Sequence, residues 1–170
     1  MYGFGPPLVI CPYFFESFDG DDPFSDFMAA LTVGRRVIRY DHRGVGLSQR
    51  EGAEISIRAL DRDLGAVVRA AGLERFDLIG WIVGGLAAMS YAALHPVQVD
   101  HLVLYTSFVT GTEVMPRAAL NGLAALSRTN WQMASQTLVD MSGRATDPDL
   151  NLRQAEILRS GSPERRSLRF

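Results

Sequence analysis

Three side chains that can do chemistry stand at the ends of two short apolar runs in this 170-residue chain. Cys11 ends the run LVIC, and Asp41 and His42 directly follow the run RVIRY. A thiolate is a nucleophile, and a carboxylate or an imidazole can accept or donate a proton. Each group also has a structural role open to it, since a free cysteine packs as a small apolar residue and an aspartate caps turns such as DHRG. We expect structural roles and retain Cys11, Asp41 and His42 as weak pocket candidates.

The remaining histidines and two of the serines fit structural positions. His95 stands at the end of a helical pattern, where a positive charge suits the helix dipole, and His101 opens an apolar run. Ser48 and Ser90 resemble a loop cap and a hydroxyl on a helix surface, without the adjacent base that activates a nucleophile. No Cys/His cluster has metal-ligand spacing, so we expect neither a metal nor a cofactor.

A glycine-lined turn, GWIVGG at 80–85, connects an apolar run to a helix of small residues. A Cβ atom at Gly80 or Gly84 is expected to clash where strand and helix approach each other. Ile82 stands at the centre, although a β-branched residue suits a strained backbone poorly. Nucleotide binding is not supported, because the turn is neither G-x-G-x-x-G nor a Walker sequence and the chain contains no lysine.

Apolar runs alternate with helical patterns along the first two thirds of the chain. This alternation predicts an α/β fold, with a central parallel sheet of about four strands flanked by helices. From residue 113 the strand signals stop and three short helices are expected, so the chain divides into 1–112 and 113–170. The predicted strands are 8–11, 36–40, 76–80 and 101–105; the predicted helices are 22–31, 57–71 and 84–95, then segments within 113–129, 130–143 and 147–161.

Composition narrows the class of protein. Hydrophobic residues make up 47% and charged residues 21%, and the formal charge is −2, which does not favour a nucleic acid or a membrane surface as partner. The single cysteine excludes an internal disulfide and fits a reducing compartment. The N-terminus lacks a basic segment, and no apolar run reaches the roughly 18 to 20 residues of a membrane span. We expect a cytoplasmic protein.

Two stretches, RVIRYDHRGVGLSQR (36–50) and FDLIGWIVGGLAAMSYAALHPVQVDHLVLYTS (76–107), resemble the α/β-hydrolase fold family. The resemblance is closer to the branch found beside adenylate-cyclase or LuxR-type regulatory domains. In that family the strand–turn–helix carries G-x-S-x-G, a sharp turn that presents a nucleophilic serine. The turn matches the motif everywhere except at the serine, through Gly80, Trp81, Ile82, Val83 and Gly84, with Gly85 following. The resemblance therefore implies that the turn is kept and the nucleophile is lost.

The resemblance implies further departures from the family. Phe14 and Val83 would hold the positions whose backbone N–H groups form the oxyanion site, and Tyr13, another weak pocket candidate, replaces a flexible glycine. The helices at 113–160 correspond to the start of a cap over the active site. The family's first two strands and its last strands, with the catalytic acid and histidine, have no counterpart in the sequence. In the family's arrangement, the four strands should lie in the spatial order second, first, third, fourth.

Three hypotheses follow for the function. The first is a hydrolase by descent, acting on ester, amide or related bonds, that is inactive in this form because Ile82 replaces the serine and acid and base are missing. The second is a non-catalytic domain that binds or senses a small hydrophobic or ester-like molecule. The third is an incomplete fragment of a full-length hydrolase.

Strand edges supply a prediction about association. Without the missing strands, 36–40 and 101–105 should both be edges with unpaired backbone groups. Arg36 and Arg39 partly protect the first, whereas LVLY carries no charge. We therefore expect a homodimer through 101–105, or aggregation, unless the helices after 113 fold back over that edge.

Overall fold

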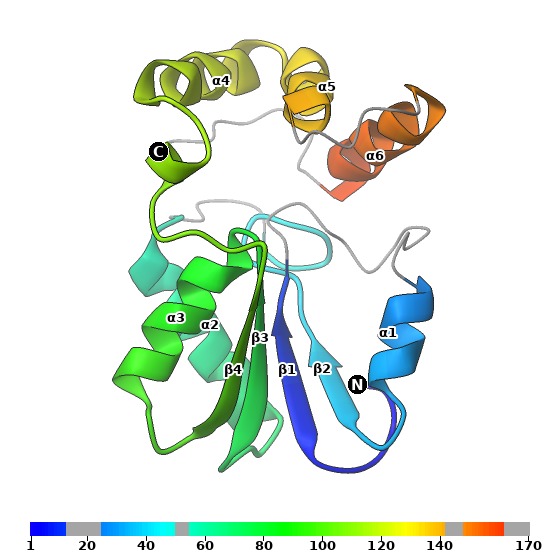
Figure 1. Ribbon diagram of the computed structural model, residues 1–170, viewed down its shortest axis with the longest axis vertical. Helices are drawn as coiled ribbons and strands as arrows, with labels where there is room; N and C mark the ends of the chain where they lie inside the picture. Colours follow the sequence, from blue (N-terminus) through cyan, green and yellow to red (C-terminus); the bar gives the residue numbers. More distant parts are fainter. Residues whose placement is uncertain (13–24, 50–54, 142–147, 162–170) are drawn as a thin grey trace.

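A four-stranded parallel sheet forms the centre of the computed structural model, which describes residues 1–12, 25–49, 55–141 and 148–161. The strands are β1 (Pro7–Cys11), β2 (Arg36–Arg39), β3 (Phe76–Trp81) and β4 (Val99–Tyr105). Their order in the sheet is β2-β1-β3-β4, and each neighbouring pair is parallel (Figure 1). The predicted fold class and strand order are confirmed. The predicted start of the last strand, residue 101, is two residues too late. Strand β4 begins at Val99, so His101 lies inside the strand and is not its first residue.

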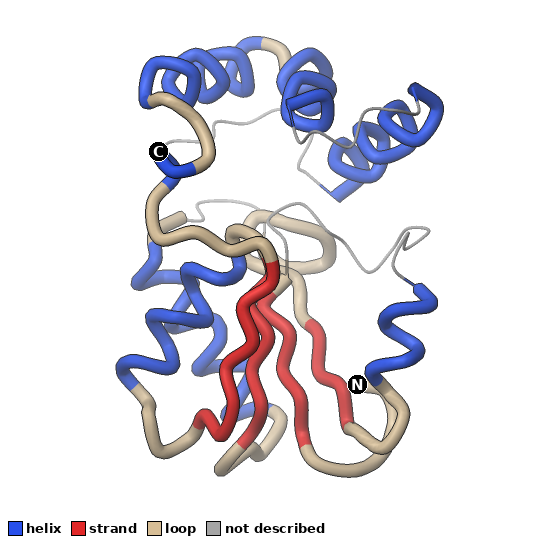
Figure 2. Tube along the Cα trace, in the orientation of Figure 1, coloured by secondary structure: helices blue, strands red, loops and turns tan. Residues whose placement is uncertain are grey.

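Helices cover both faces of the sheet. Helix α1 (Ser25–Leu31) packs on one face, while α2 (Ile57–Ala70) and α3 (Gly84–Leu94) pack on the other (Figures 1 and 2). The predicted helix at 22–31 is present from residue 25, and residues 22–24 lie outside the described part. A short turn, η1 (Gly111–Glu113), leads to α4 (Arg117–Thr129), α5 (Trp131–Met141) and α6 (Pro148–Gly161). These three helices lie beyond the carboxyl ends of the strands (Figure 1).

Local sequence signals fix the ends of α2. The Ser56 hydroxyl accepts a hydrogen bond from the Ala59 N–H at 3.2 Å, which satisfies one donor of the first turn. At the other end Gly72 adopts a φ of 63°, and the Leu73 N–H donates to the Val68 carbonyl at 3.0 Å. A glycine in this left-handed conformation is a common helix stop, as expected for Gly72.

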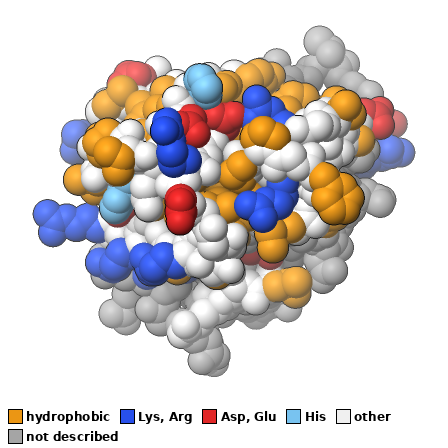
Figure 3. All heavy atoms as spheres, turned by 90° about the horizontal axis from the view of Figure 1, so that it is seen from below, with side chains coloured by type: hydrophobic (Ala, Val, Ile, Leu, Met, Phe, Trp, Pro, Cys, Tyr) orange, Lys and Arg blue, Asp and Glu red, His pale blue; other side chains and the backbone are white. Residues whose placement is uncertain are grey.

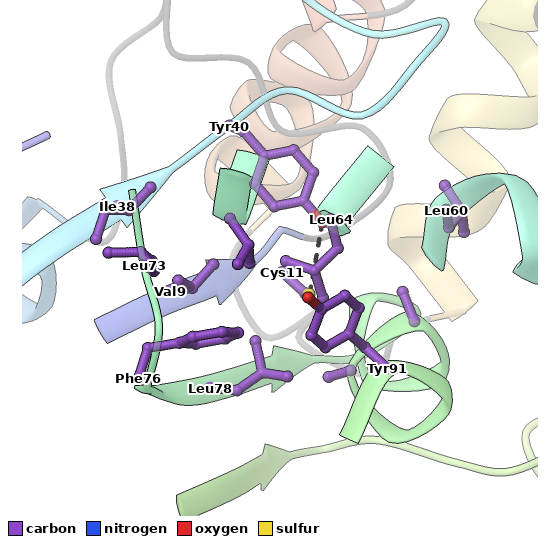
Figure 4. Packing of buried hydrophobic residues seen from close by; sticks show 13 residues of the cluster. Val9, Cys11, Ile38, Tyr40, Leu60, Leu64, Leu73, Phe76, Leu78 and Tyr91 are labelled. Carbon is purple, nitrogen blue, oxygen red and sulfur yellow. Dashed lines mark hydrogen bonds between the residues drawn. The ribbon is translucent and has the colours of Figure 1, made fainter. Parts of the chain in front are cut away.

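Strand alternation divides the apolar residues between two cores. On the α2/α3 side, the main core contains Val9, Cys11, Ile38, Tyr40, Leu60, Leu64, Val68, Leu73, Phe76, Leu78, Ala87, Ala88 and Tyr91 (Figure 4). On the α1 side, the second core contains Leu8, Ile10, Met28, Val37, Ile79 and Trp81. Strands β1 and β3 contribute to both cores, which is why their sequences are apolar almost throughout.

The helices after residue 113 have a small apolar cluster of their own. Val139 from α5 packs with Ala155 and Leu158 from α6, and the partly buried Leu138 joins them. No described residue of α4 is buried. The division into 1–112 and 113–170 stays a prediction, and the separate cluster provides a way to test it.

One edge of the sheet differs from the prediction. The Tyr2 N–H donates to the Val37 carbonyl at 3.0 Å, and the Val37 N–H donates to the Tyr2 carbonyl at 2.8 Å. The N-terminal segment therefore pairs with the outer side of β2, which the sequence had led us to expect as an open edge. The contact joins residues that are 35 positions apart in the sequence, and no local sequence pattern predicts it.

Charged side chains form ion pairs at the amino ends of the strands. Asp77 on β3 accepts hydrogen bonds from Arg35 and from His101, the latter at 2.7 Å, and Arg75 pairs with Asp100. Burial raises the pKa of Asp77, but the hydrogen bonds and charges of Arg35 and His101 outweigh this and leave the pKa below its ordinary value. Figure 3 shows basic, acidic and histidine side chains interspersed with apolar ones at this end of the molecule. None of the described helices is long and apolar enough to cross a membrane.

Candidate functional site

The turn between β3 and α3 has the backbone of a sharp, strained elbow. Ile82 adopts a φ of 51°, whereas Val83 is already helical at φ −69° and ψ −31°. The Ile82 N–H donates to the Tyr105 carbonyl at 3.0 Å, so the pairing with β4 extends up to the apex. A left-handed conformation costs an L-residue about 1–2 kcal/mol. A β-branched residue is held here only because its surroundings fix the backbone.

Three glycines allow the helix to approach the sheet. A Cβ atom at Gly84 would lie 2.4 Å from the Cys11 carbonyl oxygen, and one at Gly80 would lie 2.7 Å from the Gly85 Cα. Real Cβ atoms essentially never come so close, so the predicted clashes at 80 and 84 are confirmed. A Cβ atom at Gly85 would lie 2.1 Å from the Ser107 hydroxyl oxygen. This last contact was not predicted from the sequence, in which the small residue after the strand, Ser107, is the only sign of it.

Apolar and aromatic side chains surround the apex. Ile82 is partly buried and packs against the second core. Its neighbour Trp81 is buried and meets Phe27 and Tyr105 edge to face, with ring centroids 5.7 Å and 5.5 Å apart. Phe27 and Tyr105 are 47% and 52% exposed, so the aromatic group reaches the surface. An isoleucine side chain has no lone pair and no ionisable proton.

The carboxyl end of β1 lies directly against the elbow. The Pro12 carbonyl accepts a hydrogen bond from His42 Nε2 at 3.1 Å, and the same oxygen lies 2.5 Å from where a Gly84 Cβ would be. His42 is buried, and burial lowers its pKa, so the ring is neutral at physiological pH. His42 thus ties the loop after β2 to the segment that leads into Tyr13 and Phe14. Those two residues lie outside the described part of the chain.

Cys11 is held in a form unsuited to nucleophilic chemistry. Its side chain is fully buried in the main core, and burial raises the pKa of the thiol to about 12. The Tyr40 hydroxyl donates a hydrogen bond to the sulfur at 3.5 Å (Figure 4, dashed line). At neutral pH the residue is therefore a thiol, which is the less reactive form.

Asp41 organises the loop after β2. One carboxylate oxygen accepts a hydrogen bond from the Leu47 N–H at 2.9 Å, and the Asp41 carbonyl accepts one from the Ser48 hydroxyl at 2.7 Å. These contacts are those of a loop cap.

The other sequence candidates lie away from the elbow. His95 is the C-cap of α3, at the opposite end of that helix from Ile82, and Ser90 lies within the helix. His101 contacts Asp77 at the amino end of the sheet. The structure therefore brings Cys11 and His42 to the Pro12 segment beside the elbow and leaves His95 and His101 distant from it.

Comparison with known proteins identifies the family. Residues 6–153 match the family model described as the alpha/beta hydrolase fold. The chain belongs to the α/β-hydrolase fold family.

The curated relatives that this chain matches are longer than the chain itself. Pyrrolizixenacetamide deacetylase of Xenorhabdus hominickii is 27% identical over 145 residues, which are 85% of this chain and 53% of the deacetylase. A putative carbamate hydrolase RutD of Caulobacter sp. (strain K31) is 34% identical over 103 residues, which are 60% of this chain and 38% of that protein. The chain thus spans about half, or less, of the length of these relatives.

Solved structures show the same fold. Est816, described as an N-acyl homoserine lactone degrading enzyme, has a TM-score of 0.72 and 25% identity, over 95% of this chain and 62% of Est816. Bromoperoxidase from Bacillus anthracis has a TM-score of 0.78 and 18% identity, over 95% of this chain and 63% of that protein. The second likeness supports the α/β-hydrolase fold alone.

The turn at 80–84 has the glycine pattern that the α/β-hydrolase motif G-x-S-x-G requires. Both glycines stand where a side chain would collide with backbone, and the central residue has the positive φ of a strained apex. Ile82 is at that centre in this chain.

Proposed function

We propose that this α/β-hydrolase chain, a hydrolase by descent, does not hydrolyse esters or amides while isoleucine stands at residue 82. The observation that supports the proposal is the elbow itself. Its backbone keeps the left-handed apex and the close strand–helix contact, yet the apex residue is Ile82. Covalent hydrolysis begins with attack by a lone pair on the carbonyl carbon, and a hydrocarbon side chain has none to offer.

Neighbouring groups do not replace the missing serine. Cys11 is fully buried with a pKa of about 12, so its thiolate is scarce and unreachable. His42 donates its Nε2 proton to the Pro12 carbonyl and is itself buried. An enzyme that loses a triad member keeps roughly a thousand- to ten-thousandfold acceleration over water, from oxyanion donors and binding. With Tyr13 replacing the family's glycine beside the oxyanion position at Phe14, we expect less than that for this chain.

A second candidate function is binding without turnover, favoured by the apolar apex. Ile82 lies beside Trp81, and the neighbouring Phe27 and Tyr105 are about half exposed. Apolar and aromatic side chains with few polar groups typify sites for small molecules. The relatives named above are a deacetylase, a putative carbamate hydrolase and a lactone-degrading enzyme, so the ligand class we propose is an uncharged acyl compound such as an amide or lactone.

Hydrolysis of p-nitrophenyl acetate and butyrate tests the first proposal. The chain is expected to release nitrophenolate no faster than an unrelated folded protein at equal concentration. Ile82→Ser is expected to behave the same, because a serine without an adjacent base stays protonated and weak. Saturable turnover by the unaltered chain that survives both Cys11→Ala and His42→Ala would contradict the proposal.

Thermal unfolding of the same protein samples tests whether the chain binds a ligand without turnover. If the elbow binds uncharged acyl compounds, a short N-alkyl amide should raise the melting temperature in proportion to the logarithm of its concentration. Ile82→Asp should abolish that rise, because it places a charge among apolar groups. The control Leu94→Asp, at a residue 65% exposed on the far end of α3, should leave it intact. No rise at millimolar ligand would eliminate the binding candidate.

A further inference from the structure

Two neighbouring strands leave the sheet through the same unfavourable backbone conformation. Ile82 directly follows β3 with a φ of 51°, and Thr106 directly follows β4 with a φ of 48°. They are the two non-glycine residues of the described chain that have a positive φ. The strands lie side by side, with Trp81 paired to Tyr105 at their ends (Figure 1). Such conformations persist only where the surrounding structure fixes them, so a contact shared by both turns is expected.

The hydroxyl group of Ser107 makes that shared contact. It donates a hydrogen bond to the Gly80 carbonyl at 3.1 Å and lies 3.3 Å from the Tyr105 carbonyl as a second acceptor. The same Tyr105 carbonyl accepts the hydrogen bond of the Ile82 N–H at 3.0 Å. Ser107 therefore extends the link between β3 and β4 beyond the last paired residues, on the strand side of the apex.

Ser107 also touches the helix side of the apex. A Cβ atom at Gly85 would lie 2.1 Å from the Ser107 hydroxyl oxygen and 2.4 Å from its Cβ, so the serine side chain fills the space under the first turn of α3. The Gly85 N–H in turn donates to the Ile82 carbonyl at 3.1 Å. Residues on both sides of Ile82 are thus in contact with one side chain, which the left-handed turn at Thr106 directs back toward the elbow.

We propose that Ser107 is a positioning residue for the elbow: its hydroxyl group holds the backbone of residue 82 in the left-handed conformation that places the apex at the amino end of α3. The inference goes beyond the proposed absence of hydrolysis, because it concerns the backbone and applies to any side chain at residue 82. Without the hydroxyl, the Gly80 carbonyl loses its donor and the strained residues Ile82 and Thr106 lose the contact that they share. Both are then expected to relax toward negative φ.

A thiol introduced by Ile82→Cys reports where the apex lies. Its thiolate displaces iodide from iodoacetamide, forming a C–S bond as the C–I bond breaks, and intact mass follows the reaction. Cys11 does not interfere, because it is fully buried. The amino end of a helix lowers the pKa of a thiol, so the midpoint of the alkylation rate against pH should lie about one pH unit or more below the ordinary value.

Removal of the Ser107 hydroxyl tests the proposal in this Ile82→Cys chain. Ser107→Ala should return the midpoint to the ordinary value of a thiol, because the relaxed apex no longer faces the helix end. Ser127→Ala is the matched control, since the Ser127 hydroxyl also donates to a backbone carbonyl, that of Ala124 at 2.9 Å, but in α4. It should leave the midpoint unchanged.

An exchange of side chains separates positioning from packing. Gly85→Ala alone should lower the melting temperature, because the new methyl group collides with Ser107. Combining it with Ser107→Gly should recover much of that loss, since the nearest remaining atom, the Ser107 Cα, lies at 3.6 Å, an ordinary contact. The double variant fills the space but has no hydroxyl, so in the Ile82→Cys chain its midpoint should stay at the ordinary value.

Three results would each overturn the proposal. The first is an ordinary midpoint for Ile82→Cys alone, and the second is a lowered midpoint that persists in Ser107→Ala. The third is a lowered midpoint in the double variant, which would show that packing under α3 suffices. The double variant also decides the question if Ser107→Ala does not fold.

Discussion

Gly84→Ala is expected to lower the free energy of unfolding by about 3 kcal/mol, at or beyond the upper end of the usual cost of overpacking. The added methyl carbon would lie 2.4 Å from the Cys11 carbonyl oxygen and 2.5 Å from the Pro12 carbonyl oxygen. Both atoms belong to backbone at the end of β1, so relief requires that the strand and α3 move apart. Urea denaturation followed by circular dichroism measures the change.

Gly65→Ala is the matched control, in α2 of the same core. The methyl carbon there would meet the far end of the Arg69 side chain at 3.3 Å, and that end can move. Since alanine is the better helix former by about 1 kcal/mol, this variant should be as stable as the unaltered chain or slightly more so. A Gly84→Ala variant that loses no more stability than Gly65→Ala would contradict the tight strand–helix contact.

Phe76→Ala is expected to lower the free energy of unfolding by about 3–5 kcal/mol, the range for removing a buried aromatic ring. Phe76 is 1% exposed, in the main core beside Tyr91, with ring centroids 6.0 Å apart. The surrounding strands and helices can fill the resulting cavity only in part. Thermal unfolding monitored by tyrosine and tryptophan fluorescence should show the loss.

Leu158→Ala serves as the comparison and tests the predicted division at residue 112/113. Leu158 belongs to the separate cluster with Val139 and Ala155, so its loss should unfold α5 and α6 and leave the main transition in place. Phe76→Ala should shift the main transition. A single transition that both variants shift together would show that 113–170 is not an independent unit.

Features with a local cause could be predicted from the sequence. Apolar runs of Val, Ile and Leu predicted four strands, because buried parallel strands are apolar on both faces. The order of the strands in the sheet followed from the resemblance to the α/β-hydrolase family and from right-handed crossovers. The glycines at 80 and 84 indicated a close strand–helix contact, because glycine, which lacks a Cβ, fits where two backbone segments approach each other closely.

Features that join distant segments could not be predicted. The Tyr2–Val37 pairing, the His42–Pro12 hydrogen bond and the contact of Ser107 with Gly85 each depend on tertiary placement. A sequence does not distinguish a buried imidazole from an exposed one. The hydrogen bond by which His42 connects the loop after β2 to the Pro12 segment could therefore not be predicted. The position of β4 at one end of the described sheet was predicted correctly, because it follows from the strand order that the family resemblance implied.

Intact-mass spectrometry after incubation with p-nitrophenyl butyrate tests the central claim most directly. Hydrolysis through a nucleophile passes through an acyl-enzyme, which adds the mass of one butyryl group to the folded chain. With Ile82 at the apex and Cys11 fully buried, the chain should keep its unmodified mass, as should Ile82→Ala. A stoichiometric butyryl adduct on one residue beside the elbow, absent when the chain is unfolded in urea before incubation, would contradict the account.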